Sequence, residues 1–157
     1  MSKDEATTVL PLLIIGYGNS LRSDDGLGWH VTQELLRTVD SAGVEIISCG
    51  QLTADLAEPI SHAGQVLFID AAHSGPAGQV ICKRVTPTSE AAAFSHQLSP
   101  EALLGITLVL FGACPEATLF SIAGQSFEFG DSLSPPVANC MPALISRIKE
   151  FMVECEK

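Results

Sequence analysis

The sequence is poor in basic residues. Only 8 Lys and Arg stand against 18 Asp and Glu, and the formal net charge is -10 at pH 7. Nucleic acids and anionic membranes bind proteins through clustered Lys and Arg. We therefore expect no nucleic acid and no membrane as a partner. The acidic surface fits plain solubility, and it also fits an encounter with a cation or a basic peptide.

Cysteine pairs and long apolar runs are also missing. The five Cys are odd in number and none is spaced as C-x-x-C, so the sequence contains neither a disulfide framework nor a zinc knuckle and indicates reduced, intracellular thiols. No apolar run is long enough to span a bilayer. Residues 1–8 are polar and acidic, the reverse of the basic start of a signal peptide. We expect a cytoplasmic protein in which residues 1–8 form a flexible N-terminus.

The patterning that is present predicts strands alternating with helices in a single domain, residues 1–157. The continuous apolar run at 9–15 predicts a strand buried on both faces. Further strands are expected at 44–48, 65–69, 79–85 and 118–123, with 79–85 at an edge because it alternates apolar and polar residues. Helices are expected at 25–39, 53–60, from Ser99 onward and at 136–153. Asp24 and Asp25 are predicted to cap the first of these helices, and Ser99 the third.

This order predicts an α/β fold, in which a mostly parallel sheet is covered by helices on both faces. Ligands of such sheets bind beyond the carboxyl ends of the strands. Asp25, Asp70 and His96 belong to polar segments at that rim. Two carboxylates and an imidazole suit a divalent metal ion with positions left open for another ligand. The same three residues also fit a helix cap, a turn cap and a surface loop, and pattern alone leaves these roles open.

Two other chemistries are poorly supported. The loop at 16–21 lacks the third glycine of a dinucleotide fingerprint, and Asp24 and Asp25 would repel a pyrophosphate there. The sequence has no G-x-S-x-G motif. Cys114 and His96 are a conceivable Cys–His pair, but Cys114 lies in a turn-like G-A-C-P segment, and we expect an inert thiol.

The segment GYGNSLRSDDGLG, residues 16–28, resembles the G-x-G-N-x-L-x-x-D-[DE]-G-x-G signature of the [NiFe] hydrogenase maturation endopeptidases. The resemblance continues, in the expected order, through FIDAA at 68–72, SHQLSP at 95–100, the stretch 112–135 and PPVANCMPALI at 135–145. It implies a single three-layer domain with a five-stranded twisted sheet. It also implies an endopeptidase that removes the C-terminal extension of a hydrogenase large-subunit precursor after nickel insertion.

The resemblance further implies which residues act and on what. The family's three metal-binding positions fall on Asp25, Asp70 and His96, and either carboxylate is a candidate catalytic base. The nickel is brought by the precursor, the protein partner, and zinc or cadmium is expected to substitute in isolation. The protease itself is expected to be a monomer.

One segment departs from the family. Most members carry an Asp followed by Gly-Thr after the second strand, whereas this chain has Cys49-Gly50-Gln51-Leu52-Thr53. The Gln-Leu pair resembles the branch that serves bidirectional, NAD(P)-coupled hydrogenases. We expect Gly50, Gln51 and Leu52 to bind substrate. A non-catalytic reading stays open, in which the chain is a nickel-dependent assembly chaperone or a metal-binding module on the same fold.

Overall fold

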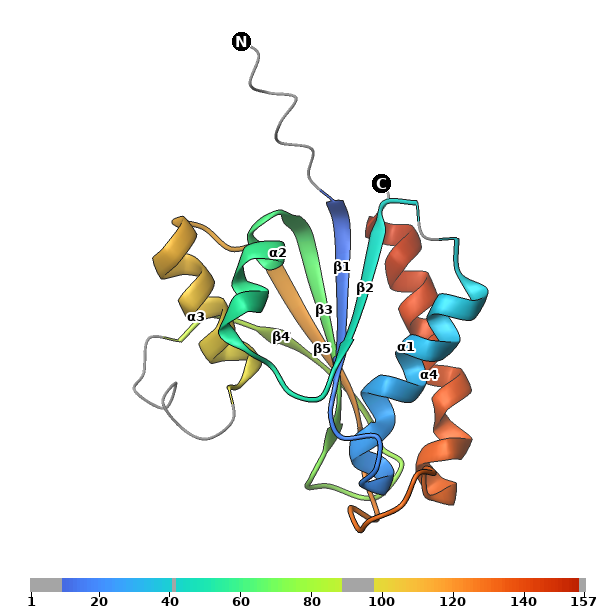
Figure 1. Ribbon diagram of the computed structural model, residues 1–157. Coiled ribbons are helices and arrows are strands. Elements are labelled where there is room, and N and C mark those ends of the chain that lie inside the picture. The colour runs from blue at the N-terminus through green and yellow to red at the C-terminus, as the bar shows by residue number, and fades with distance from the viewer. Residues whose placement is uncertain (1–9, 41, 89–97, 156–157) are drawn as a thin grey trace.

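A five-stranded sheet forms the middle layer of the computed structural model, which describes residues 10–40, 42–88 and 98–155 (Figure 1). The strands are β1 (Leu10–Tyr17), β2 (Val44–Cys49), β3 (Ala63–Ala72), β4 (Val80–Val85) and β5 (Glu116–Ala123). Their order is β2-β1-β3-β5-β4. Strands β2, β1, β3 and β5 run parallel to one another, and β4 runs antiparallel to β5 at one edge. The predicted mostly parallel sheet is confirmed, as is the edge position of the strand near residue 80.

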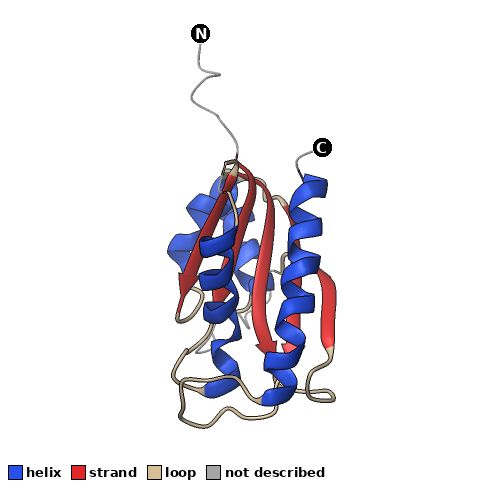
Figure 2. Cartoon of the chain, turned by 90° about the vertical axis from the view of Figure 1, so that its right-hand side faces the viewer, coloured by secondary structure: helices blue, strands red, loops and turns tan. Residues whose placement is uncertain are grey.

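Helices cover both faces of the sheet (Figures 1 and 2). They are η2 (Ser23–Gly26), α1 (Leu27–Thr38), η3 (Ala54–Leu56), α2 (Ala57–Ser61), α3 (Pro100–Phe111) and α4 (Pro135–Cys155). Helices α1 and α4 pack on one face, and α2 and α3 pack on the other. Among the described residues, no helix is both long and apolar enough to cross a membrane. The flexible N-terminus expected at residues 1–8 lies outside the described residues.

The central strand explains why the first apolar run is continuous. All four residues from Leu12 to Ile15 are fully buried. Leu12 and Ile14 join the core under α1 and α4, while Leu13 and Ile15 join the core under α2 and α3. Because successive side chains of a strand point to opposite faces, a strand between two helical layers needs apolar residues at every position.

Several element ends differ from the sequence-based expectation by a few residues, and two of them bear on the site. Strand β3 runs to Ala72 rather than to residue 69, so Asp70 lies within the strand and pairs in register with Ser121 of β5. Backbone pairing with β5 extends the strand beyond its apolar residues, and the hydrophobicity of the sequence does not indicate this extension. The prediction that Asp24 and Asp25 cap the first helix was wrong. Helix α1 begins at Leu27 behind Gly26 and has no side-chain cap, because η2 occupies the preceding turn.

The third helix begins as predicted. The Ser99 side chain accepts a hydrogen bond from the backbone N–H of Ala102, and Pro100 occupies the first turn. Local capping chemistry was sufficient here because the whole signal lies within four adjacent residues.

Helix α1 lies unusually close to the end of β1. A Cβ placed on Gly28 would stand 2.4 Å from the backbone nitrogen of Tyr17, and one on Gly16 would stand 2.5 Å from the carbonyl oxygen of Gly28. Only hydrogen atoms fit between these backbones. The two glycines therefore fix the height of α1 above the sheet and with it the position of the connecting residues 18–26.

We predict that Gly28→Ala destabilises the protein by about 1–3 kcal/mol, because the added methyl overpacks against fixed backbone. In an ordinary helix position the same change stabilises by up to about 1 kcal/mol, so the sign of the effect is diagnostic. Urea unfolding monitored by circular dichroism measures it. Gly50→Ala is the matched control, since a Cβ there meets no atom within 4 Å. Equal or higher stability of Gly28→Ala would contradict the close approach.

Candidate functional site

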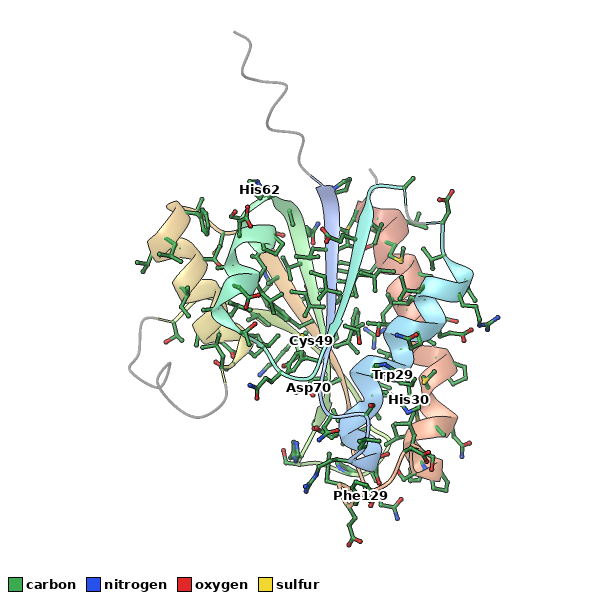
Figure 3. The ribbon with its side chains drawn as sticks, in the orientation of Figure 1. Trp29, His30, Cys49, His62, Asp70 and Phe129 are labelled. Atoms are coloured by element: carbon green, nitrogen blue, oxygen red, sulfur yellow. The ribbon has the colours of Figure 1, made fainter. Side chains whose placement is uncertain are left out.

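Asp25 and Asp70 line one small pocket at the carboxyl ends of the central strands. The pocket has a volume of about 130 Å³. Its other lining residues are Tyr17, Gly18, Gly50, Gln51, Leu52, His73 and Leu98. Figure 3 shows Asp70 at the end of the sheet where the strands converge. The two carboxylates predicted to share a site thus lie in the same pocket, together with the loop 50–52 that was expected beside them.

Asp25 is held by the turn that follows β1. Its Oδ2 accepts a hydrogen bond of 2.8 Å from the backbone N–H of Asn19. Gly18 has a φ of 134°, and a Cβ at that position would stand 2.0 Å from the carbonyl oxygen of Asp25. The turn therefore requires glycine and wraps closely around Asp25. This arrangement leaves Oδ1 directed toward His73, whose Nε2 is 3.8 Å away.

Asp70 is a carboxyl group with a strongly raised pKa. Burial is the main cause, and the negative charge of Asp25 adds to it; hydrogen bonds from the Ala71 N–H and the Tyr17 hydroxyl oppose the shift. The resulting pKa is about 7. The pKa of Tyr17 is raised as well, first by its own burial and then by Asp70. A carboxyl group that titrates near neutrality is suited to accept and return a proton during hydrolysis.

His73 is a site residue that the sequence analysis did not single out. Its ring stacks on Phe127, with centroids 4.0 Å apart and planes 16° apart. The pair also borders an adjoining hollow of about 380 Å³ that Asp25 and Arg22 help to line. His73 comes three residues after Asp70, at the same strand end, and that position was the available signal. No local feature of the sequence indicated that Phe127 would stack on the ring of His73 and orient it.

Asp24 is fully buried and serves the structure rather than the pocket. Its carboxylate accepts hydrogen bonds from the backbone N–H groups of Gln125, Ser126 and Ser134 at 2.7, 3.0 and 2.7 Å. The Ser134 hydroxyl donates a fourth, of 2.7 Å. Burial acts to raise the pKa of Asp24, but these donors outweigh it and the pKa is lowered. Asp24 thus binds the β5–α4 connection, which carries Phe127.

The expected metal triad is described only in part. His96 lies outside the described residues, and within the described ranges no group of three His, Cys, Asp or Glu side chains could hold a metal ion. Asp25 and Asp70 do supply carboxylate oxygens, which accept divalent ions such as nickel or zinc. The metal-binding roles of Asp25, Asp70 and His96 stay predictions.

Neither Cys49, which ends β2 beside the site, nor Cys114, which precedes β5 at the opposite end of the sheet, is activated. Burial raises the pKa of Cys49, and the charge of Asp55 raises it further; burial alone raises the pKa of Cys114. A raised pKa leaves little thiolate, which is the nucleophilic form, at neutral pH. These directions support the expectation that Cys114 is inert.

The fold was compared with known proteins. No family model matches this chain, and no curated protein sequence does. Solved structures do match. The hydrogenase maturating endopeptidase HybD from E. coli is 24% identical, with a TM-score of 0.73, over 91% of this chain and 92% of its own. The [NiFe] hydrogenase maturation protease HycI from Thermococcus kodakarensis is also 24% identical, with a TM-score of 0.71, over 95% and 97% of the two chains.

This chain has the fold of the hydrogenase maturation proteases. A hydrogenase 2 maturation peptidase from a Thaumarchaeota archaeon agrees, at 23% identity and a TM-score of 0.68 over 90% and 97% of the chains. At these identities the likeness establishes the fold, which is the five-stranded arrangement that the sequence resemblance implied.

We predict that Asp24→Asn destabilises the protein by more than about 2 kcal/mol at pH 7, because charged hydrogen bonds are lost and an amide N–H₂ then faces backbone donors. A lowered pKa stabilises the fold above the pKa of the unfolded chain, and this contribution is lost as the pH falls through the lower folded value. The difference from wild type should therefore shrink below about pH 4.

Urea unfolding at several pH values measures this effect. Asp131→Asn, an exposed carboxylate in the same connection, is the matched control. Equal stability of the two variants at pH 7 would contradict the anchoring role of Asp24.

Proposed function

We propose that this chain is an endopeptidase that removes the C-terminal extension of a [NiFe] hydrogenase large-subunit precursor after nickel insertion. One observation carries the proposal. Asp25 and Asp70 share a pocket beside the loop 50–52, on a fold that solved hydrogenase maturation proteases share. We expect the reaction to take place in the cytoplasm, since the sequence indicates reduced thiols.

The mechanism starts from the nickel that the precursor carries as part of the substrate. Asp25, Asp70 and His96 complete its coordination from the protease side, so the scissile bond is positioned only in a nickel-loaded precursor. The bound metal polarises the scissile carbonyl or lowers the pKa of a water molecule. Asp25 or Asp70 then accepts the proton of the attacking water and returns it to the leaving amine, since both carboxylates line the pocket.

We predict that the protein shortens a nickel-loaded large-subunit precursor and leaves the nickel-free precursor intact. Intact-mass spectrometry of the precursor measures the loss and locates the cleaved bond. Asp25→Asn, Asp70→Asn and His96→Ala should each slow cleavage by at least about 100-fold, since each removes a ligand or a proton acceptor. Cys114→Ser is the control and should cleave at the wild-type rate.

Two outcomes would contradict this assignment. Complete loss of cleavage in a folded Cys114→Ser variant would favour a cysteine nucleophile. Tight binding of the nickel-loaded precursor without any shortening would favour the non-catalytic chaperone.

Gln51 is expected to set the choice of hydrogenase, and the Gln-Leu pair at 51–52 points to bidirectional, NAD(P)-coupled enzymes. An amide donates and accepts hydrogen bonds, whereas an ionised carboxylate only accepts. A polar group left unpaired in a closed interface costs about 1–3 kcal/mol, which corresponds to tenfold or more in discrimination.

We predict that Gln51→Asp lowers the cleavage rate of the cognate precursor relative to a precursor of another hydrogenase class, while metal binding survives. Gln51→Asn is the matched control, because it has the same length as Asp and keeps the amide. The two rates, measured by mass spectrometry for each variant, give the ratio. If Gln51→Asp and Gln51→Asn give the same ratio as wild type, Gln51 takes no part in substrate choice.

A further inference from the structure

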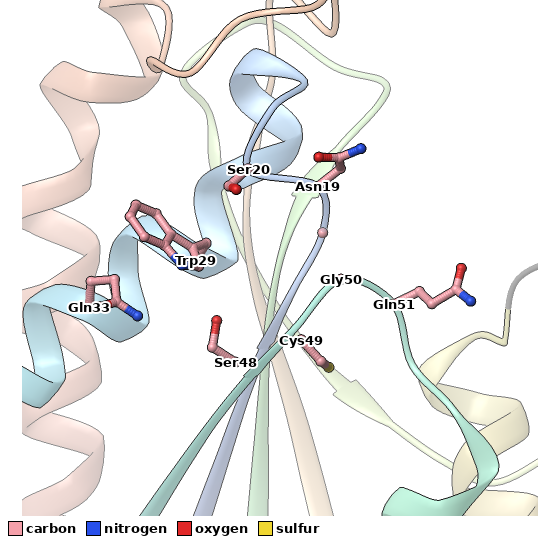
Figure 4. A pocket seen from close by; sticks show the side chains of 9 residues that line it. Asn19, Ser20, Trp29, Gln33, Ser48, Cys49, Gly50 and Gln51 are labelled. Carbon is pink, nitrogen blue, oxygen red and sulfur yellow. The ribbon is translucent and has the colours of Figure 1, made fainter.

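A third and larger hollow opens beside the carboxylate pocket. This groove has a volume of about 620 Å³ and lies between α1 and the carboxyl end of β2 (Figure 4). Its lining includes Gly18, Gly50 and Gln51, which also line the pocket of Asp25 and Asp70. The groove and the pocket therefore adjoin, and a chain that lies in the groove and passes over these shared residues reaches the two carboxylates.

The walls of the groove follow from the periodicity of the two elements. Val44 and Ile46 of β2 pack toward α1 and α4, while Ile47 and Cys49 pack toward the opposite face. Ser48 therefore faces α1. Helix α1 presents Trp29 and Gln33, which are four residues apart and lie on the same side of the helix. The indole of Trp29 is 42% exposed and stands edge-on to the ring of His30, with centroids 5.1 Å apart.

Among the described residues, no strand pairs with the outer edge of β2, whose Ser48 and Cys49 line the groove. Strand β2 is outermost in the sheet, with β1 as its neighbour on one side. The carbonyl oxygen of Cys49 accepts a hydrogen bond from Gly18, on the β1 side. Because backbone groups alternate along a strand, those of Ser48 face the outer edge. An extended peptide can pair with such an edge through its main chain.

The residues that line the groove indicate which kind of molecule binds there. Although 17% of the residues in the chain are charged, none of those lining the groove is. They are Gly18, Asn19, Ser20, Trp29, Gln33, Ser48, Cys49, Gly50 and Gln51. Amides and hydroxyls match the neutral donors and acceptors of a peptide backbone, and they lack the charge that a phosphate or a metal ion needs. The indole adds an aromatic surface for one side chain.

We propose that this groove binds the substrate polypeptide, extended along β2 and adjoining the scissile bond, and that Trp29 is a specificity-determining residue that contacts a substrate side chain. The identity of the substrate rests on the proposed function; the groove itself requires only an extended peptide. The neutral groove holds the chain while the acidic pocket holds the metal.

Trp29 is the single tryptophan of the chain and reports directly on the groove. The experiment titrates the full-length protein with a tryptophan-free synthetic peptide that spans the cleaved bond, and follows indole emission. We expect a saturable change in emission with this peptide and weaker binding of a scrambled peptide of the same composition, which keeps the main chain but moves the side chain that Trp29 contacts. Leu36→Ala, which removes an exposed apolar side chain elsewhere on α1, should respond like wild type. Unchanged emission at saturating peptide would overturn the proposal.

Cleavage kinetics give a second readout. Truncation of an aromatic anchor commonly costs tenfold or more in binding, so Trp29→Ala should raise KM about tenfold and change kcat less than about twofold. Trp29→Phe should restore most of the affinity, which also guards against misfolding of the Ala variant. If Trp29→Ala and Leu36→Ala have the same KM while wild type cleaves, the groove proposal fails and the proposed function stands. An emission change with the peptide, together with no shortening of the nickel-loaded precursor, supports peptide binding and refutes the endopeptidase.

Discussion

The rest of the site depends on the hydrogen bonds that the buried carboxylate of Asp24 accepts. This carboxylate joins η2 to the β5–α4 connection through four hydrogen bonds from residues about 100 positions away. Asp25 is its sequence neighbour, and Phe127, which stacks on His73, belongs to the connection it holds. One buried charge, satisfied by donors on a distant segment, therefore positions both sides of the pocket. The two adjacent acidic residues therefore have different roles. Asp24 is buried and holds the connection, whereas Asp25 lines the pocket.

The pocket carries negative charge that the protein itself compensates incompletely. Burial and Asp25 disfavour ionisation of Asp70, and only the Ala71 N–H and the Tyr17 hydroxyl oppose them. A divalent cation would relieve that repulsion, because an opposite charge nearby favours the ionised carboxyl. The acidic chain as a whole adds an attractive field for such a cation. These electrostatics suit a site that recognises a metal arriving with its substrate.

The neutral groove beside the pocket has a different chemical character. Its amides, hydroxyls and indole suit hydrogen bonds and apolar contact with a peptide, whereas the carboxylates of the pocket suit the positive charge of a metal ion. Gln51 lines both hollows and lies where they join. A substrate that must present both a folded metal centre and an extended chain has a place for each.

The sequence by itself determined the layered α/β fold, because burial on two faces leaves a continuous apolar run in β1 and because caps such as Ser99 act over a few residues. It also indicated Asp25 and Asp70, since parallel strands end at a common rim. Only the tertiary structure decided what Asp24 binds, how Phe127 orients His73, and that Trp29 and Ser48 face each other across a groove. These contacts join segments far apart in the chain, and such contacts have no period or spacing that a sequence can display.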